Sequence, residues 1–389
     1  LEPSGVPLKF KFLPQYLKPF GYHTHLVGKW HLGYCNQSLT PLKRGFDSFY
    51  GFYNGREDHF SHVLEERLPE YHTYGLDLWN RWEPDWTKNG TYSTHLFANR
   101  VIKILETHNQ FEPFFIYLAF SAPHAPLQAP EKYVNACSHW KNRNRRLYCG
   151  MVYVLDTDIG RIVKSLKSNR LYNDTIIVFS TDNGGQYLFG GNNYPLRGNK
   201  ATVWEGGTRA VSFVHSPQYI RKPGIRHEKL FHVADWLPSI LGAAIGSSLN
   251  FSGDGINQWN MISNGARGLR HSFPYYIDKK SAAIRKGRFK LVQGYPGRLN
   301  GWYPPPLSNS EGSVRSVEDK KNLSGIWLFD LKKDPMERKN LANAKPRVVS
   351  RMKSVISQWR QTMVPLITRP YSRKGDPVNF NGTYATGWC

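Results

Sequence analysis

Phe114-Phe-Ile-Tyr-Leu-Ala-Phe120 is an unbroken apolar run, and Ser121-Ala-Pro-His124-Ala-Pro-Leu127 follows it directly. An apolar run of this length predicts a strand buried on both faces, which is typical of parallel sheets covered by helices. The prolines around His124 exclude a helix and place this histidine in a rigid loop at the carboxyl end of the strand. Ligands of α/β proteins bind at that end, so the stretch predicts a fold class and a candidate site together.

Strands and helices alternate on both sides of this run. Further strands are expected at His25–Gly28, Thr175–Ser180 and Ala210–Val214. Helices are expected from the spacing of apolar residues at Leu13–Phe20, Leu96–His108, Arg146–Lys167 and Phe231–Ile245. The alternation predicts an α/β class with a mostly parallel sheet flanked by helices.

After about residue 265 the pattern changes. Ala282–Arg285 and Phe289–Val292 flank a Lys-Gly turn and predict an antiparallel hairpin, with a third strand at Trp327–Leu331 and a closing helix at Val348–Met363. We therefore expect a large α/β domain over residues 1–265 and a smaller α+β subdomain over residues 266–389.

The charge of the chain favours a polyanionic partner. Its 389 residues carry 52 basic and 29 acidic side chains, a net charge of +23, and hydrophobic residues make up 40% of the chain. Nucleic acid, anionic lipid and sulfated or phosphorylated substrates all fit this excess. Nucleic acid has only the net charge in its favour, without a recognised motif, and is not expected as a partner. No apolar stretch reaches the length of about 18 residues that a membrane span needs.

Glycosylation sequons and cysteines favour the secretory pathway. Six Asn-x-Ser/Thr sequons begin at Asn36, Asn89, Asn173, Asn250, Asn322 and Asn381. The four cysteines allow three pairings. Cys137 with Cys149 closes a short loop and is favoured, which leaves Cys35 with Cys389.

Four polar segments are candidates for chemistry. Lys29 and His31 lie two residues apart, which on an extended segment directs both side chains to one side, where they suit an anion. Asp182-Asn183 follows the strand at Thr175–Ser180 and offers the hard oxygen ligands that suit calcium or magnesium, although Asp-Asn-Gly-Gly is also ordinary turn chemistry. The fourth segment is the Gly/Asn-rich loop up to Lys200, which could hold an oxyanion through backbone N–H groups and charge. With His124, the set predicts a metal-assisted site for a tetrahedral oxyanion.

Several motifs resemble the arylsulfatase family. They are Gly28-Lys-Trp-His-Leu-Gly33, Arg44-Gly-Phe-Asp47, Ser121-Ala-Pro-His-Ala-Pro-Leu127, Thr181-Asp-Asn-Gly-Gly185, Pro195-Leu-Arg-Gly-Asn-Lys200, Trp204-Glu-Gly-Gly207, His232-Val-Ala-Asp-Trp-Leu-Pro238 and Leu328-Phe-Asp-Leu-Lys-Lys-Asp-Pro335. Their order and spacing are most similar to the arylsulfatase B, I and J branch, and the similarity covers essentially the whole chain.

The resemblance implies an alkaline-phosphatase-like α/β fold and hydrolysis of sulfate monoesters with one calcium ion. Carried over residue by residue, Asp182 and Asn183 match metal ligands, and Lys29, His124 and Lys200 match groups that hold the sulfate oxygens. His31 matches the histidine beside the nucleophile. The implied substrate is a sulfated glycosaminoglycan sugar such as N-acetylgalactosamine 4-sulfate, and the implied location is the lysosome or the extracellular space.

The chain departs from the family in two places. The family's nucleophile is a formylglycine made from Cys in a Cys-x-Pro/Ala-Ser-Arg motif, and an Asp-Asp pair supplies further metal ligands; neither motif occurs here. Both lie upstream of the Lys29 region in the family. We therefore expect the catalytic domain to be incomplete at its amino-terminal side and these 389 residues alone to be inactive.

Two alternatives stay open. One is a secreted, non-catalytic paralogue that binds polyanions such as glycosaminoglycans, with basic patches at Arg143–Arg146 and Lys164–Arg170. The other is a metal-dependent phosphoesterase on the same fold, which is disfavoured because two-metal sites need more carboxylates and histidines than these loops contain.

Overall fold

The computed structural model describes residues 1–67, 71–246, 253–305 and 323–389. The chain forms two compact units. The first contains Leu1–Ser138, Leu147–Asn173 and Ile367–Cys389, and the second contains His139–Arg146 and Asp174–Leu366. Each unit groups segments that contact one another, even where they are far apart in the sequence. The predicted domain boundary at residue 265 stays a prediction.

A five-stranded mixed sheet forms the centre of the first unit, in the order β6-β5-β2-β1-β7. Its strands are β1 (His23–Lys29), β2 (Ser48–Phe52), β5 (Trp79–Asn80), β6 (Glu83–Pro84) and β7 (Phe114–Ala119). Strand β1 runs parallel to β2 and β7, whereas β5 pairs antiparallel with β2 and β6 with β5. Of the predicted strands, those at His25–Gly28 and Phe114–Phe120 lie in this parallel part as β1 and β7. The predicted strands at Thr175–Ser180 and Ala210–Val214 do not, because they pair antiparallel with each other in a separate sheet.

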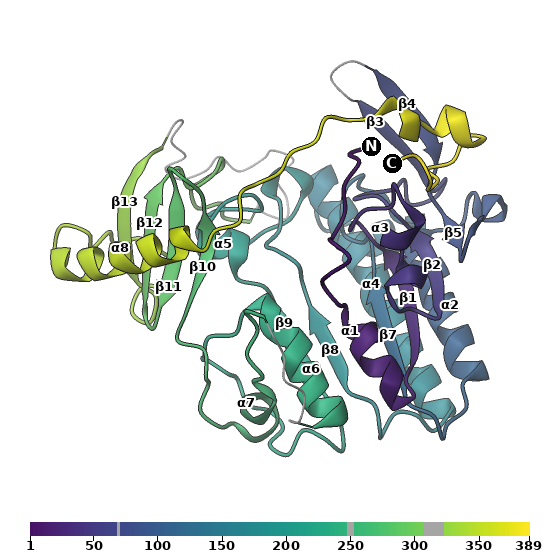
Figure 1. Cartoon of the computed structure of the whole chain (residues 1–389), viewed down its shortest axis with the longest axis horizontal. Helices are drawn as coiled ribbons and strands as arrows, with labels where there is room; N and C mark the ends of the chain where they lie inside the picture. Colours follow the sequence, from purple (N-terminus) through teal and green to yellow (C-terminus); the bar gives the residue numbers. More distant parts are fainter. Residues whose placement is uncertain (68–70, 247–252, 306–322) are drawn as a thin grey trace. The chain divides into compact units, whose positions relative to one another are not determined.

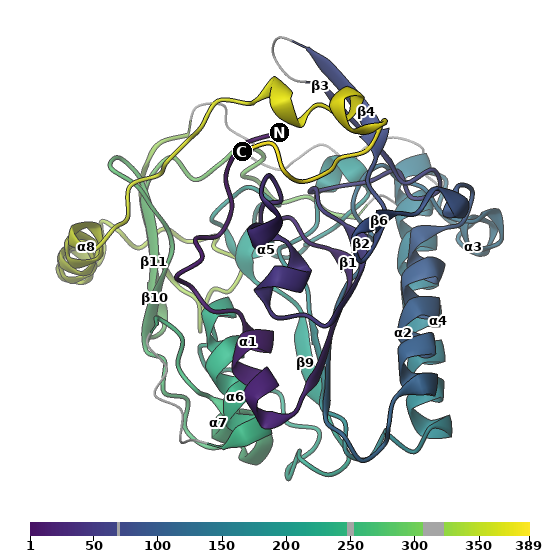
Figure 2. The same cartoon turned by 45° about the vertical axis from the view of Figure 1, so that its right-hand side comes forward.

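Helices cover both faces of this sheet. Figure 2 shows α2 (Ser93–Thr107) and α4 (Arg143–Ser168) along one face and α1 (Leu13–Leu17) on the other. The remaining elements of the unit are α3 (Glu131–Ala136) and a separate hairpin of β3 (Val63–Arg67) and β4 (His72–Leu76). The two chain ends lie together (Figure 1), where the N–H of Ser372 donates to the carbonyl of Leu1 at 3.0 Å.

The close pairing of β1 with β7 depends on a glycine. Gly28 has φ = 102°, and a Cβ atom there would lie 2.1 Å from the carbonyl oxygen of Ala119. A side chain at this position would separate the two strands whose ends carry Lys29 and His124.

The second unit contains two antiparallel sheets. Strands β8 (Ile177–Ser180) and β9 (Ser212–His215) form a pair. The other sheet has the order β10-β11-β12-β13, with β10 (Ser272–Ile277), β11 (Ala282–Lys286), β12 (Phe289–Gly294) and β13 (Gly325–Asp330). Helix α8 (Pro346–Gln361) packs Val349, Met352 and Ile356 against β11–β13 (Figure 1). The predicted hairpin, third strand and closing helix are confirmed; the unit also has α5 (Glu205–Thr208), α6 (Trp236–Ile245) and α7 (Trp259–Asn264).

Two strands are less buried than the sequence predicts. Strand β7 is the last strand of its sheet, and Tyr117 on it is 54% exposed. Of the strands that the structure describes, β8 pairs with β9 alone, and Phe213 on β9 is 52% exposed. The prediction that these strands are buried on both faces is therefore wrong. Apolar composition shows that a strand is suited to a buried position, but it does not determine how many other elements pack against that strand.

Both disulfides follow the favoured pairing, with bonds Cys35–Cys389 and Cys137–Cys149. Among the described residues, no helix is long and apolar enough to cross a membrane.

Candidate active site

In the first unit, two predicted site residues lie at the same edge of the parallel sheet. Lys29 is the last residue of β1, and the loop with His124 follows the end of β7. Gly28 and Ala119 are paired in register, so the two strands end side by side. The structure therefore brings the segments of Lys29 and His124 together, as the strand-end argument predicts.

His31 lies beyond the strand in a left-handed conformation, with φ = 51°. Its backbone N–H donates to the carbonyl of Tyr53 at 2.9 Å, and its ring packs on Gly55, where a Cβ atom would lie 2.6 Å from the ring carbon Cε1. The expectation that Lys29 and His31 share one side of an extended segment is therefore wrong, since the extended backbone ends at Lys29. The Gly55 turn, and not strand alternation, orients His31.

His124 is fixed through both its ring and its backbone. Its Nδ1 lies 2.7 Å from the carbonyl oxygen of Ala125, a contact that requires Nδ1 to donate and leaves Nε2 as the other functional nitrogen. Its backbone carbonyl accepts from Nε2 of the buried His59 at 3.0 Å. The ring is thus held in one tautomer and one orientation.

A buried carboxylate supports the turn that faces His31, and the sequence alone did not reveal it. Asp77 accepts hydrogen bonds from the N–H groups of Tyr53 and Asn54, each at 2.9 Å, and from the Asn54 side chain at 2.8 Å. Burial raises the pKa of Asp77 to about 6, although these donors oppose the shift. The Asn54-Gly55 dipeptide is a turn signal that could have drawn attention to this segment.

In the second unit, Asp182 and Asn183 follow β8 directly. The carboxylate of Asp182 is exposed and makes no hydrogen bond or ion pair with any residue that the structure describes. The Asn183 side chain donates from Nδ2 to the carbonyl of Gly184 at 2.9 Å, which leaves its Oδ1 oxygen as the ligand atom. Both residues therefore present oxygen atoms of the kind that calcium binds.

Lys200 lies close to this pair along the folded backbone, because its N–H donates to the carbonyl of Gly185 at 3.2 Å. The side chain of Asn193 bridges the same segment, accepting from Gly185 N at 2.7 Å and donating to Gly198 O at 3.2 Å. The ammonium group of Lys200 has no ion-pair partner among the described residues. The structure thus brings Asp182, Asn183 and Lys200 together on one interlinked set of loops.

The backbone of this loop is not free to hold an oxyanion in the way that the glycine content suggests. Gly190 N donates to Tyr187 O at 3.1 Å, Gly191 N donates to Gln186 O at 3.0 Å, and Gly198 N donates to Gly301 O at 2.8 Å. The N–H group of Lys200 is used as described above. A backbone cradle is therefore a wrong prediction for these four groups, and the charge of Lys200 is what the loop offers to an anion.

Asp182 and Asn183 fit a calcium ion as two of its ligands. Calcium takes about six to eight oxygen ligands. The described residues contain no group of three or more His, Cys, Asp or Glu side chains that could hold a metal ion. The assignment of these two residues to a metal site therefore stays a prediction.

The six predicted residues form two sets of three. Lys29, His31 and His124 belong to the first unit, and Asp182, Asn183 and Lys200 belong to the second. The roles assigned to them stay predictions. Four sequon asparagines are exposed, at Asn36, Asn89, Asn173 and Asn381, whereas Asn250 and Asn322 lie outside the described residues.

Comparison with known proteins decides the family. The family model described as "Sulfatase" matches residues 2–247. The chain belongs to the sulfatase family. Arylsulfatase J of Mus musculus is 38% identical over 412 residues, which cover 100% of this chain and 68% of that protein. N-acetylgalactosamine-6-sulfatase of Homo sapiens is 28% identical, with 93% and 70% covered.

Solved structures agree with this assignment. Ps i-CgsB in complex with k-i-k-neocarrahexaose superposes with a TM-score of 0.73 at 27% identity, covering 92% of this chain and 76% of that one. The sulfatase fold of the alkaline-phosphatase type is thereby confirmed, and family membership makes the protein a sulfuric ester hydrolase. Sulfatases use a metal ion and a formylglycine.

Proposed function

We propose that the protein takes part in calcium-dependent hydrolysis of sulfate monoesters on glycosaminoglycan sugars, such as N-acetylgalactosamine 4-sulfate. The observation that carries the proposal is the pair of uncompensated opposite charges on one set of loops. Asp182 and Lys200 lie on linked segments, yet neither has an ion-pair partner among the described residues. A carboxylate suits a cation and an ammonium group suits an oxyanion, so the two charges fit a bound metal ion and a sulfate group.

Each residue then has a role that its surroundings permit. By the family motifs, Lys29 and His124 of the first unit and Lys200 of the second each match groups that hold sulfate oxygens, a role in which they offset the charge that grows on the transferring group. His31, backed by the Gly55 turn, orients the nucleophile and assists turnover. Asp182 and Asn183 hold the metal ion, which when bound adds positive charge beside the sulfate.

The four cysteines do not supply the nucleophile. The sequence contains no Cys-x-Pro/Ala-Ser-Arg motif, and all four cysteines are in disulfide bonds. We therefore expect these 389 residues to bind sulfate esters without hydrolysing them.

The proposal includes a location in the secretory pathway, in the lysosome or outside the cell. Disulfide bonds persist in oxidising compartments. Two of them, together with four exposed sequon asparagines, support this location. The N-acetylgalactosamine-6-sulfatases among its relatives act on a sulfated amino sugar by name, which supports the substrate class.

Calorimetric titration tests the proposal. N-acetylgalactosamine 4-sulfate is titrated into the protein with calcium or with a chelator, and unsulfated N-acetylgalactosamine serves as the ligand control. We expect binding that requires both the sulfate group and calcium. Lys200→Met should lower the affinity for the sulfated sugar about tenfold or more. The variant Lys333→Met, which removes an exposed charge of the second unit, is the matched control. Equal binding of the sulfated and unsulfated sugars would overturn the proposal.

The second candidate is a non-catalytic glycosaminoglycan-binding protein. The observation in its favour is that every cysteine is paired, together with exposed Lys164, Lys167 and Arg170 at the end of α4. Binding that falls steeply with salt and is unchanged by Lys200→Met and by chelation would favour this candidate.

A further inference from the structure

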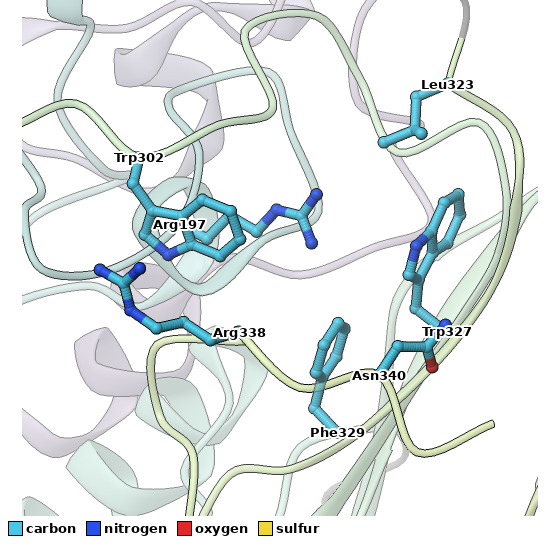
Figure 3. Close-up of a pocket in the computed structure, with 7 residues that line it drawn as sticks. All are labelled: Arg197, Trp302, Leu323, Trp327, Phe329, Arg338 and Asn340. Atoms are coloured by element: carbon cyan, nitrogen blue, oxygen red, sulfur yellow. The ribbon is translucent and has the colours of Figure 1, made fainter. Parts of the chain in front are cut away.

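The second unit contains a cavity of about 170 Å³ between the Lys200 loop and the four-stranded sheet. Figure 3 shows the side chains that surround it, from four separate segments around Arg197, Trp302, Leu323–Phe329 and Arg338–Asn340. Its described lining residues include three aromatic rings, two arginines and no acidic side chain. Such a lining excludes a cationic ligand and suits one with an apolar face and a negative charge.

The aromatic rings form rigid walls. Trp302 and Phe329 are buried, and Trp327 is partly exposed. The indole N–H of Trp302 donates to the carbonyl of Met336 at 2.8 Å, so this ring has a fixed position. Aromatic faces of this kind pack against the C–H face of a sugar ring. The cavity is smaller than the pockets that hold drug-sized ligands, so it fits one sugar unit and not a whole oligosaccharide.

The arginines give the cavity its charge. The Arg197 guanidinium lies between two indole rings, 3.9 Å from the centroid of Trp204 and 4.6 Å from that of Trp302. The Arg338 guanidinium lies 5.1 Å from the Trp302 ring. Arg338 is exposed and has no hydrogen-bond or ion-pair partner among the described residues, so its five donors can bind a ligand.

The same loop carries this cavity and the proposed sulfate-binding lysine. Arg197 lies three residues before Lys200. The loop is bonded to the segment that carries Trp302, because Gly198 N donates to Gly301 O at 2.8 Å and Asn192 Nδ2 donates to Tyr303 O at 3.0 Å. A ligand in the cavity therefore contacts the structure that positions Lys200.

We propose that this cavity is an accessory subsite that binds a second sulfated sugar unit of a polymeric substrate, one whose ester is not being cut. The inference rests on the proposed function. The sugar ring packs against the partly exposed Trp327, and its sulfate group receives hydrogen bonds from Arg338, since guanidinium groups pair with such anions through two parallel bonds. The subsite makes the protein favour oligosaccharides over single sugars.

The test compares a 4-sulfated chondroitin hexasaccharide with N-acetylgalactosamine 4-sulfate by calorimetry in the presence of calcium. We expect Arg338→Gln to weaken hexasaccharide binding about tenfold and to leave monosaccharide binding unchanged. The control Arg351→Gln removes one exposed arginine from α8 and should change neither. The indole N–H signals of Trp302 and Trp327 should shift on addition of the hexasaccharide and shift less in Arg338→Gln.

The outcomes separate the subsite from the proposed function. If Lys200→Met abolishes binding of both sugars while Arg338→Gln changes neither, the subsite is wrong and the proposed function stands. Equal losses in Arg338→Gln and Arg351→Gln would mean attraction by net charge alone and would also overturn the subsite. If neither sugar binds the unaltered protein, both proposals fall.

Discussion

Each unit holds its functional segment with buried carboxylates, but the two units stabilise these groups differently. In the first unit, Asp77 accepts hydrogen bonds from neutral donors on Tyr53 and Asn54. In the second, Lys290 lies between Glu205 and Glu337, at 2.9 Å and 2.8 Å, and all three side chains are buried. The first arrangement fixes a turn through dipoles, whereas the second fixes the end of the Lys200 loop through a charged triad.

The two carboxyl groups of the triad differ in how burial and the neighbouring Lys290 change their pKa values. Burial raises the pKa of Glu337 to about 7, although the nearby Lys290 opposes the shift. Burial alone would also raise the pKa of Glu205, but Lys290 and the Tyr275 hydroxyl, which donates to Glu205 at 2.9 Å, lower it. One ammonium group therefore pairs with two carboxyl groups. Of the two, Glu337 has the raised pKa and is the one that takes up a proton first as pH falls.

The largest expected effect comes from removing the charge at the centre of the triad. Lys290→Met leaves two buried carboxylates without a cation and should lower the free energy of unfolding by about 3–5 kcal/mol. Urea denaturation measures the loss. The variant Lys333→Met serves as control, because Lys333 is exposed and lies on the same unit. A loss as small as that of the control would show that the triad does not stabilise the fold.

The pH dependence of stability compares the two arrangements directly. The folded-state pKa values of Asp77 and Glu337, about 6 and about 7, exceed the ordinary values of 3.8 and 4.5, so the folded protein binds these protons more tightly. Their contribution is greatest below the ordinary values and is lost as pH rises through the folded values. His25, whose pKa burial lowers to about 4, acts in the opposite direction, so the comparison requires variants.

Asp77→Asn and Glu337→Gln should each remove part of the stability difference between pH 5 and pH 7.5. Thermal unfolding at the two pH values measures it, as the change in melting temperature of the variant against that of the unaltered protein. A variant whose pH dependence equals that of the unaltered protein would show that its carboxyl group does not titrate in this window.

These contacts mark the limit of what the sequence predicts. Lys29, His124 and Asp182 could be placed because each follows an apolar strand, and strand ends are a local feature of sequence. The triad joins residues 85 and 132 positions apart, and Asp77 lies 24 positions from Tyr53. Such pairings depend on tertiary packing, which no local pattern encodes. The same holds for β7, whose apolar run predicted burial although, among the described residues, the strand has a neighbour on one side only.

A smaller effect is expected at the glycines that allow close backbone contact in each unit. A Cβ atom at Gly184 would lie 1.7 Å from Gly206 O, so Gly184→Ala should cost about 1–3 kcal/mol and displace Asp182 and Lys200. Gly28→Ala is the counterpart in the first unit. Gly160→Ala is the control, since a Cβ atom there meets nothing within 4 Å and alanine favours the helix by about 0.5–1 kcal/mol. Calorimetry measures the loss of stability, and calcium titration measures the displacement of Asp182. Unchanged stability in Gly184→Ala would mean that the loop can move to accommodate the added methyl group.

The smallest effect on stability should come from Lys200→Met. Lys200 and Lys290 are both lysines of the second unit, but Lys290 is surrounded by carboxylates and Lys200 has no ion-pair partner among the described residues. Removing the Lys200 charge should therefore change the free energy of unfolding by less than about 0.5 kcal/mol. The effect of Lys200→Met should appear in sulfate binding instead. Lys290→Met should do the opposite and lower the free energy of unfolding, measured by urea denaturation at the same pH, more than it weakens sulfate binding. If Lys200→Met unfolds as easily as Lys290→Met, then Lys200 belongs to the fold, and its assignment to the ligand fails.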